Sequence, residues 1–465
     1  MTAQMTSRIF VAAFAILLGL ASFATIHGQA PAKDKTALPA DSTGILQGPS
    51  PAIPGAPSSN QIANDAAAQA PVYGLQGVLV ETLDGKTVSF QSVHETFNPA
   101  SAIKLATALI ALKTFGPEHR FTTGIWISGS FDKTTGTIDG NLYISGRDPS
   151  FHSEHAVMVA RQLNNLGIRT ITGDLVVAPG FAMNFNSSPR RSGERFYDTL
   201  DATLRSSEAT RAWAYERLVM GDKESLDTTP SVIVMGEALV SPVAPGAKLL
   251  LSHSSSRLVD ILKVLLCYSN NFMAERIGDS VGGIQAVWRQ LITSLGIAPG
   301  EFMISSLSGL GVNRVTPRAM MKIFRALRME LQKHGLSPSD IMPVAGIDPG
   351  TLADRFKDLT ARGSVIAKTG TLTRTDGGAS SLVGQMKTAN EETLLFVIMN
   401  QHGNVLRFRE NQDYLVQQVQ NTRGGPKAFK YNPHTLAMRL ADTKSSFGSA
   451  SEEYEPVTKT STSSP

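Results

Sequence analysis

The chain has 465 residues, 42% of them hydrophobic, which is enough for two domains because a single core rarely grows beyond roughly 250–300 residues. Its net charge is only +4, and the Lys and Arg residues are scattered without a basic block, which argues against a nucleic-acid partner. The single cysteine, Cys267, excludes an internal disulfide bond. Its apolar surroundings predict a buried side chain that is not a nucleophile.

The first 30 residues have the pattern of a secretory signal peptide. Arg8 precedes an apolar run from Ile9 to Ala24, and small residues follow. The run is short for a membrane span, which needs about 20 apolar residues, and an uncleaved N-terminal anchor is the alternative. Either form predicts an exported protein of the periplasm or cell envelope, with no other membrane association. Residues 31–70, rich in Ala, Pro, Ser, Gln and Gly, predict a flexible linker.

Residues 71–121 are expected to form the N-terminal part of the main domain. Two β-prone runs flank Asp84 and Gly85, a dipeptide that favours a hairpin turn. The segment "NPASAIKLATALIAL", residues 98–112, then predicts a buried helix because Ala, Ile and Leu occupy nearly every position.

Residues 122–245 predict a separate inserted domain of mixed α/β type. Its β-prone pieces, such as "FTTGIWISG" and "TITGDLVVA", are interrupted by the helical stretch "SEHAVMVARQLNNLG". Residues 246–426 begin with helical periodicity and return to strand character in "GSVIAKTGTL" and "TLLFVIMN". They are expected to complete the main domain as a sheet built from both ends of the chain and covered by helices. Residues 427–465 predict a disordered tail from their composition.

The start of the 98–112 helix carries two residues that suit a catalytic role as well as a structural one. Ser101 and Lys104 stand at positions i and i+3, so we expect both side chains on one helix face. A serine needs a base to act as a nucleophile, and a lysine can be that base if burial and a nearby cation lower its pKa. The backbone N–H groups at a helix start can bind an oxyanion. The alternative is an ordinary helix with a capping serine and a surface lysine.

Two further short motifs carry polar residues. In "CYSNNFMAE", Ser269 could relay a proton to a leaving amine, while Asn271 could hold a substrate peptide and the lysine; a helix break capped by Ser269 is the alternative. In "IAKTGTL", Lys368 and Thr369 would point to opposite sides of a strand. Gly370 would let a substrate backbone or carboxylate approach closely. A cation and a hydroxyl there could bind a terminal carboxylate, and a turn at a strand end is the alternative.

The three motifs together are far more specific than each one alone. Ser-x-x-Lys, Ser-x-Asn and Lys-Thr-Gly, in this order, form the signature of penicillin-binding proteins and serine β-lactamases. The long gap between the first two motifs accommodates an insertion. With the stretches "GNLYISGRDPSF", "LVDILKVLLCYSNNFMAERIG" and "PVAGIDPGTLADRF", the chain resembles the D-alanyl-D-alanine carboxypeptidase/endopeptidase family, the low-molecular-mass class C penicillin-binding proteins.

The resemblance implies a multi-domain α+β fold. A penicillin-binding-protein/β-lactamase-like transpeptidase domain, an antiparallel sheet flanked by helices, would carry the inserted mixed α/β domain. The implied substrates are peptidoglycan stem peptides that end in D-Ala-D-Ala, and β-lactams would be inhibitors. No metal or organic cofactor is implied, and the nine histidines show no metal-ligand spacing.

The resemblance also implies a role for each motif residue. Ser101 would attack the penultimate carbonyl, Lys104 would accept its proton, and Ser269 would pass a proton to the departing D-Ala. The oxyanion would lie between the backbone N–H groups of Ser101 and Thr371, and water would then hydrolyse the acyl-enzyme. The residues implied in substrate binding are Asn271, Lys368, Thr369, Gly370 and Thr371.

Three departures from the family pattern stand out. Asn270 replaces the Asp that is usual in the best-known members, and "SSLSGLGVNRVTP" lacks the acidic residue that often precedes Ser-Gly-Leu. Residues 183–227 look unlike the usual inserted domain, so the balance between carboxypeptidase and endopeptidase activity stays open. The alternatives are a β-lactamase or esterase of the same fold, against which the insertion argues, and a non-catalytic cell-wall-binding module, against which three complete motifs argue.

Overall fold

The computed structural model describes residues 73–448. The predicted signal peptide and the whole predicted linker therefore lie outside the described residues. Among the residues that are described, no helix has both the length and the apolar character needed to cross a membrane.

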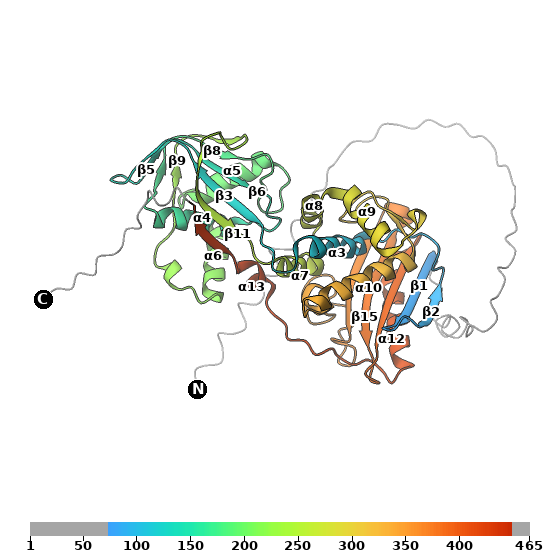
Figure 1. Cartoon of the computed structure of the whole chain (residues 1–465). Helices are drawn as coiled ribbons and strands as arrows, with labels where there is room; N and C mark the ends of the chain where they lie inside the picture. The colour runs from blue at the N-terminus through green and yellow to red at the C-terminus, as the bar shows by residue number, and fades with distance from the viewer. Residues whose placement is uncertain (1–72, 449–465) are drawn as a thin grey trace, which may run out of the picture. The chain divides into compact units, whose positions relative to one another are not determined.

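An antiparallel five-stranded sheet forms the centre of the main domain (Figure 1). Its strand order is β14-β15-β16-β1-β2, so strands from both ends of the chain lie side by side, as predicted. Every neighbouring pair runs antiparallel, with Leu79 opposite Val397 and Lys368 opposite Val383. The strands are β1 (Leu75–Thr82), β2 (Thr87–Gln91), β14 (Val365–Leu372), β15 (Ala379–Lys387) and β16 (Thr393–Gln401).

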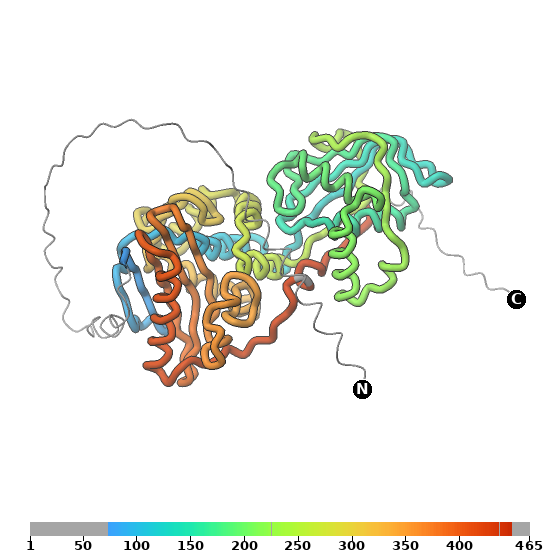
Figure 2. The backbone as a smooth tube through the Cα atoms, turned by 180° about the vertical axis from the view of Figure 1, so that it is seen from behind, coloured from blue at the N-terminus to red at the C-terminus, as the bar shows by residue number. Residues whose placement is uncertain are grey.

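Helices cover both faces of this sheet. On β16, Val397 contributes to one apolar core with α3 and α10, while its neighbour Phe396 contributes to a second core with α12. Burial on both faces explains why "TLLFVIMN" is apolar throughout instead of alternating. Figures 1 and 2, which view the molecule from opposite sides, show α10 over one face of the sheet and α12 over the other. These helices are α3 (Lys104–Phe115), α10 (Pro317–Lys333) and α12 (Val405–Asn421).

The remaining elements of the main domain extend the helical layer beside α3. Buried residues of α7, α8 and α9 belong to the same apolar core as α3 and α10. Cys267 lies on α7, fully buried, and burial raises the pKa of its thiol to about 12, which confirms the predicted inert side chain. The elements are η2 (Ala100–Ile103), α7 (Leu258–Tyr268), α8 (Asn271–Ser280), α9 (Gly283–Leu295), η4 (Pro299–Glu301), β12 (Phe302–Met303), β13 (Arg314–Val315), α11 (Pro338–Ile341) and η5 (Thr375–Gly377).

Two further sheets form the inserted domain, which is of mixed α/β type as predicted. One has six strands in the order β10-β8-β6-β3-β11-β17, and the other has four in the order β4-β5-β7-β9. The strands are β3 (Thr122–Ile127), β4 (Ser130–Asp132), β5 (Thr137–Asp139), β6 (Leu142–Gly146), β7 (Thr170–Ile171), β8 (Leu175–Val177), β9 (Ile233–Val234), β10 (Ala238–Val240), β11 (Lys248–Ser254) and β17 (Lys444–Phe447). The helical elements are α4 (Ser153–Asn165), α5 (Pro189–Leu200), α6 (Ser207–Val219) and η3 (Glu224–Leu226).

The structure shifts two of the predicted boundaries. β11 begins after residue 245 yet pairs with β3, so the inserted sheet continues to Ser254. The prediction of a tail without structure from residue 427 is wrong up to residue 448, because α13 (Leu436–Ala441) and β17 lie there. β17 is ordered by pairing with β11, with Phe447 opposite Leu251, and such long-range pairing is not encoded in local composition. Residues 449–465 lie outside the described part.

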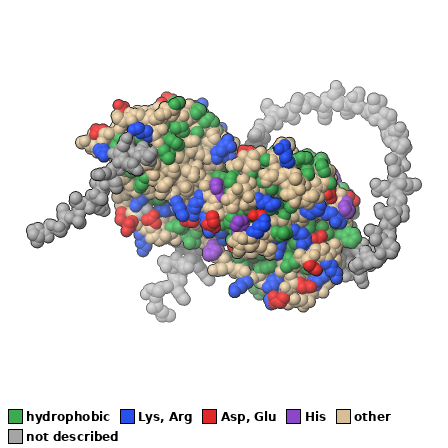
Figure 3. Space-filling view, viewed as in Figure 1, with side chains coloured by type: hydrophobic (Ala, Val, Ile, Leu, Met, Phe, Trp, Pro, Cys, Tyr) green, Lys and Arg blue, Asp and Glu red, His purple; other side chains and the backbone are tan. Residues whose placement is uncertain are grey.

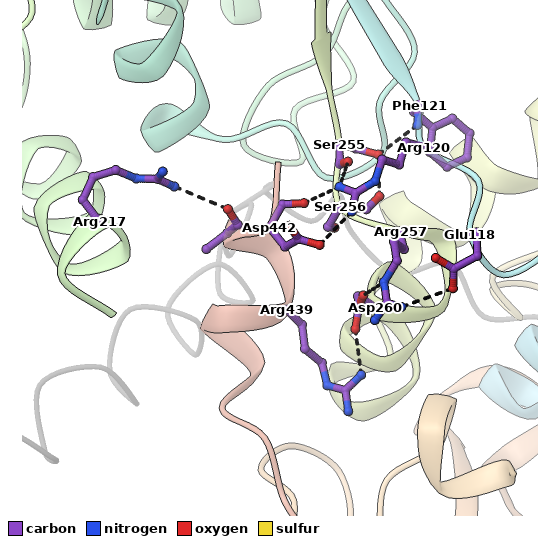
Figure 4. A network of polar contacts seen from close by, with 11 residues as sticks. Glu118, Arg120, Phe121, Arg217, Ser255, Ser256, Arg257, Asp260, Arg439 and Asp442 are labelled. Atoms are coloured by element: carbon purple, nitrogen blue, oxygen red, sulfur yellow. Dashed lines mark hydrogen bonds and ion pairs between the residues drawn. The ribbon is translucent and has the colours of Figure 1, made fainter. Parts of the chain in front are cut away.

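Ion pairs fix this C-terminal segment to earlier parts of the chain (Figure 4). Arg120 donates to the carboxylate of Asp442 at 2.7 Å and to the carbonyl of Ser255 at 2.8 Å. Asp260 on α7 accepts from Arg439 at 2.8 Å and from Arg257 at 2.9 Å. The segment therefore contacts both points at which the chain passes between the two domains.

Elsewhere, on the face shown in Figure 3, acidic and basic side chains are interspersed.

Candidate active site

Ser101 and Lys104 meet at the junction of two helix types. Ser101 lies in the 3₁₀ turn η2, and Lys104 is the first residue of α3. Side chains at positions i and i+3 eclipse one another in a 3₁₀ helix. Lys104 Nζ accordingly lies 2.9 Å from Ser101 Oγ. Ala100 has a φ of 45°, a region that L-residues rarely adopt, so the turn that presents Ser101 is strained.

Lys104 is fully buried and has three polar partners. Besides Ser101 Oγ, its Nζ contacts Asn271 Oδ1 at 2.8 Å and the backbone carbonyl of Ser308. The last two groups can only accept, so a neutral amine would donate its two hydrogens to them and keep its lone pair for the Ser101 hydroxyl. After a proton transfer, an ammonium group would donate to all three. The same contacts thus satisfy Lys104 before and after it takes a proton.

The surroundings of Lys104 favour its neutral form. Burial is the main cause that lowers the pKa of Lys104 well below its ordinary value, and the charge of Lys368 lowers it further. Glu275 opposes this effect. The carboxylate of Glu275 on α8 also accepts the backbone N–H of Ser308 at 2.8 Å, which positions the Ser308 carbonyl. Glu275 on α8 therefore supports the loop that contains Ser-Gly-Leu, in which the acidic residue that often precedes this triplet is absent.

The second motif spans the break between α7 and α8. Ser269 ends α7 with a φ of 58°, in the left-handed region, and does not cap the following helix. Asn270 caps α8 instead, since its side-chain oxygen accepts a hydrogen bond from the backbone N–H of Met273 at 2.9 Å. An Asp would perform the same capping, so the departure at this position leaves the site unchanged. Asn271 then begins α8 and reaches Lys104.

The third motif lies on β14, an edge strand of the five-stranded sheet. Lys368 is fully buried, and its Nζ lies 2.9 Å from Ser269 Oγ and 2.7 Å from the carbonyl of Thr369. Burial lowers the pKa of Lys368 to about 7. Thr369 and Thr371, which lie two residues apart and so point to one side of the strand, line a cavity. Lys368 does not line this cavity, but it contacts Ser269, which does.

Gly370 lies in close contact with the turn that carries Ser101. A Cβ atom at this position would come within 2.4 Å of the Pro99 carbonyl and 2.2 Å of Ser381 Oγ. Gly370 therefore allows β14 to pack against the turn that carries Ser101. Its missing side chain sets the distance between the first and third motifs.

The motifs converge on a cavity of about 430 Å³, the central cavity, which holds both Ser101 and Ser269. Its lining residues are Ser101, Ser269, Gly350, Thr351, Asp354, Arg355, Thr369, Thr371 and Arg409. Residues 350–355 and Arg409 were not predicted as site residues. The sequence "GIDPGTLADRF" resembles the family and could have indicated residues 350–355 as part of the site. Arg409 lies on an ordinary amphipathic helix, and no sequence signal indicated it.

Sequence comparison identifies relatives over most of the chain. The D-Ala-D-Ala carboxypeptidase 3 (S13) family matches residues 60–191 and 228–422. The unmatched stretch between them, residues 192–227, lies wholly within the 183–227 segment that looked atypical. A D-alanyl-D-alanine carboxypeptidase from Actinomadura sp. (strain R39) is 26% identical over 73% of this chain and 80% of its own. D-alanyl-D-alanine carboxypeptidase DacB from Haemophilus influenzae is 23% identical over 64% of this chain and 79% of its own.

Solved structures share the fold. The penicillin G-acylated Bd3459 predatory endopeptidase from Bdellovibrio bacteriovorus, in complex with immunity protein Bd3460, has a TM-score of 0.67 at 21% identity and covers 81% of this chain and 100% of its own. Penicillin binding protein 4 (dacB) from H. influenzae has a TM-score of 0.58 at 20% identity and covers 78% of this chain and 99% of its own. These likenesses confirm the predicted penicillin-binding-protein fold. Because the family model also matches well over half of its residues, the chain belongs to the D-Ala-D-Ala carboxypeptidase 3 (S13) family of serine peptidases.

Proposed function

We propose that the protein is a serine-type D-Ala-D-Ala carboxypeptidase that acts on peptidoglycan stem peptides through an acyl-enzyme on Ser101. The observation that carries this proposal is the pairing of Ser101 Oγ with a buried Lys104 amine at 2.9 Å, at the wall of the central cavity. Family membership supports the reaction type, and the predicted signal sequence supports a place in the periplasm or cell envelope.

The first half of the reaction forms the acyl-enzyme. The Ser101 hydroxyl gives its proton to Lys104 while Oγ forms a bond to the carbonyl carbon of the penultimate D-Ala. The oxyanion is bound by the backbone N–H groups of Ser101 and Thr371. When the C–N bond breaks, the proton that Lys104 accepted passes through the hydroxyl of Ser269 to the leaving nitrogen, and Lys104 returns to its neutral form. Lys368 contacts Ser269 Oγ at 2.9 Å. Free D-Ala departs.

The second half releases the shortened peptide. A water molecule attacks the ester carbonyl and gives a proton to Lys104, which returns it to Ser101 Oγ as the ester C–O bond breaks. A β-lactam follows the first half in the same way, but its ring-opened product stays attached because its leaving group is tethered. Thr369 and Thr371 offer hydroxyl groups to the substrate carboxylate from the cavity wall, and Asn271 orients the peptide and Lys104.

Intact-mass measurement after incubation with benzylpenicillin tests the proposal. One adduct should form, map to the peptide that holds Ser101, and be absent from Ser101→Ala. In parallel, D-Ala release from a pentapeptide ending in D-Ala-D-Ala should fall at least about 1,000-fold in Ser101→Ala. Equal and slow release by both proteins would contradict an enzyme and favour a wall-binding module.

Two further comparisons separate the remaining alternatives. Hydrolysis of the penicillin adduct within seconds would indicate a β-lactamase, whereas persistence over many minutes supports the peptidase. Cleavage of a cross-linked peptide dimer at a rate similar to that of the pentapeptide would add D,D-endopeptidase activity.

A further inference from the structure

Arg409 is a cation on the wall of the central cavity that the reaction outlined above does not use. It lies in the first turn and a half of α12, whose apolar face packs on the sheet through Phe408 and Leu415. Its guanidinium Nη2 donates to Thr371 Oγ1 at 2.8 Å. Arg409 and Thr371 line the same cavity as Ser101.

The other cations near the cavity are already neutralised or enclosed. Arg355 forms an ion pair with Asp413, with Nε 2.9 Å from the carboxylate. Lys368 is fully buried behind Ser269 and does not line the cavity. Within the part of the chain that the structure describes, Arg409 forms no ion pair. Partial burial and the charge of Arg355 lower the pKa of Arg409, while Asp413 opposes them without pairing with Arg409. An anion in the cavity would further offset the lowering.

The contact between Arg409 and Thr371 also orients a hydroxyl group. A guanidinium can only donate, so Thr371 Oγ1 must be the acceptor. The hydroxyl hydrogen of Thr371 is then free to donate to another acceptor, and Thr371 faces the cavity. Together the two residues present a charged donor and a neutral donor beside the predicted nucleophile. Such a pair matches a carboxylate, which accepts hydrogen bonds through both oxygens.

We propose that Arg409 selects substrates with a free terminal carboxylate, by binding this carboxylate together with the Thr371 hydroxyl. The inference rests on the proposed function, since the carboxylate is that of the leaving D-Ala or the equivalent group of a penicillin. Arg409 supplies the positive charge at the cavity wall, while Lys368 acts on Ser269. Two alternatives are a merely structural role for Arg409 and an effect on Thr371 alone.

The test compares acylation by benzylpenicillin with acylation by its methyl ester, which lacks the carboxylate. Second-order rate constants are measured for the wild type, Arg409→Gln, Arg409→Lys and Arg407→Gln. Arg407 is the matched control because it lies on the same helix, is exposed and pairs with Glu410. Arg409→Gln should acylate about 10- to 100-fold more slowly with the acid and within twofold of the wild type with the ester. Arg409→Lys should recover part of the loss, and Arg407→Gln should match the wild type.

The outcomes distinguish the explanations. Equal losses with both compounds would overturn the proposal in favour of a structural role, and unchanged rates with both would overturn it outright. A full loss in Arg409→Lys, despite its charge, would indicate that only the contact with Thr371 matters and would also contradict charge selection. Absence of any adduct on wild-type Ser101 would instead refute the acyl-enzyme, and the Arg409 proposal with it.

Discussion

The side-chain oxygen of Asn271 accepts a hydrogen bond from Lys104 Nζ at 2.8 Å. The partner is a neutral amide, whereas a carboxylate in the same place would stabilise the ammonium form. Asn271 therefore satisfies a buried amine without adding the negative charge that would keep it protonated. This choice of residue makes the Ser101–Lys104 pair suitable for proton transfer.

Asn271→Asp is expected to move the acidic limb of the pH–rate profile upward by about one to three pH units. The new carboxylate favours the protonated form, so the pKa of Lys104 rises and less neutral amine is present at pH 7. Penicillin acylation rates between pH 5 and 10 measure the shift. Asn270→Asp is the control, since residue 270 caps α8 and an Asp there should leave the profile unchanged. An unshifted profile in Asn271→Asp would contradict the role given to Lys104.

Lys368→Met should stabilise the protein at pH 6 while it slows acylation. The folded-state pKa of about 7 lies below the ordinary value of 10.5, so below pH 7 the folded protein holds a buried charge that the unfolded chain holds in water. This penalty is fully present below pH 7 and decreases as the pH rises toward 10.5. Replacing a buried charge with an apolar side chain of similar size should raise the free energy of unfolding by about 1–4 kcal/mol at pH 6.

Denaturant unfolding of both proteins at pH 6 and pH 9.5 checks this effect, with a smaller difference expected at the higher pH. If Lys368→Met raises the free energy of unfolding by the same amount at both pH values, Lys368 is not the titrating group. The acylation rate should fall because Ser269 loses its cationic neighbour.

Gly370→Ala is expected to separate β14 from the turn that carries Ser101. The added Cβ would meet the Pro99 carbonyl at 2.4 Å, so the backbone must move. We expect a loss of about 1–3 kcal/mol in stability and, because a shift near 1 Å disturbs the alignment of reacting groups, a rate reduction near 100-fold. Gly300→Ala is the control, because nothing lies within 4 Å of a Cβ there. Wild-type acylation by Gly370→Ala would contradict the packing role.

The Lys263–Asp348 ion pair supports the loop that precedes Gly350 in the cavity wall. Both side chains are buried, with Nζ 2.6 Å from Asp348 Oδ2, and the hydroxyl of Tyr431 donates to Oδ1 at 2.8 Å. Asp348→Asn leaves the buried ammonium without a counter-charge and should cost about 3–5 kcal/mol in denaturant unfolding. Adding Lys263→Met should recover much of that loss. A cost below 1 kcal/mol for the single variant would show that the pair does not stabilise this loop.

Much of the fold could be predicted because its signals are local. The apolar run around Val397 predicted a strand, and the hairpin at Asp84 placed another strand at the opposite end of the chain. Ser101 and Lys104 could be paired from their spacing alone, since three residues on a helix span about one turn. The position of Asn271 relative to the lysine came from the family motif and not from spacing.

The rest could not be predicted because it depends on contacts between distant segments. The Ser308 carbonyl completes the Lys104 site from a loop that lies 204 residues further along the chain. Arg409 resembles any exposed arginine on an amphipathic helix until the fold brings Thr371 beside it. The burial of Lys368 beside Ser269 could not be predicted either, because a strand pattern shows that residues alternate but not which side is enclosed.

The pairing of β17 with β11 has a consequence for biosynthesis. The six-stranded sheet reaches its full width only after residues 444–447 have been synthesised and have paired with β11. Until then, the free side of β11 offers unpaired backbone groups to any neighbouring chain, a recognised route to aggregation. A premature stop or a protease cut just after α12 would keep every residue of the central cavity and still leave that side open, so such fragments should be captured by chaperones or lost to aggregates despite an intact catalytic half.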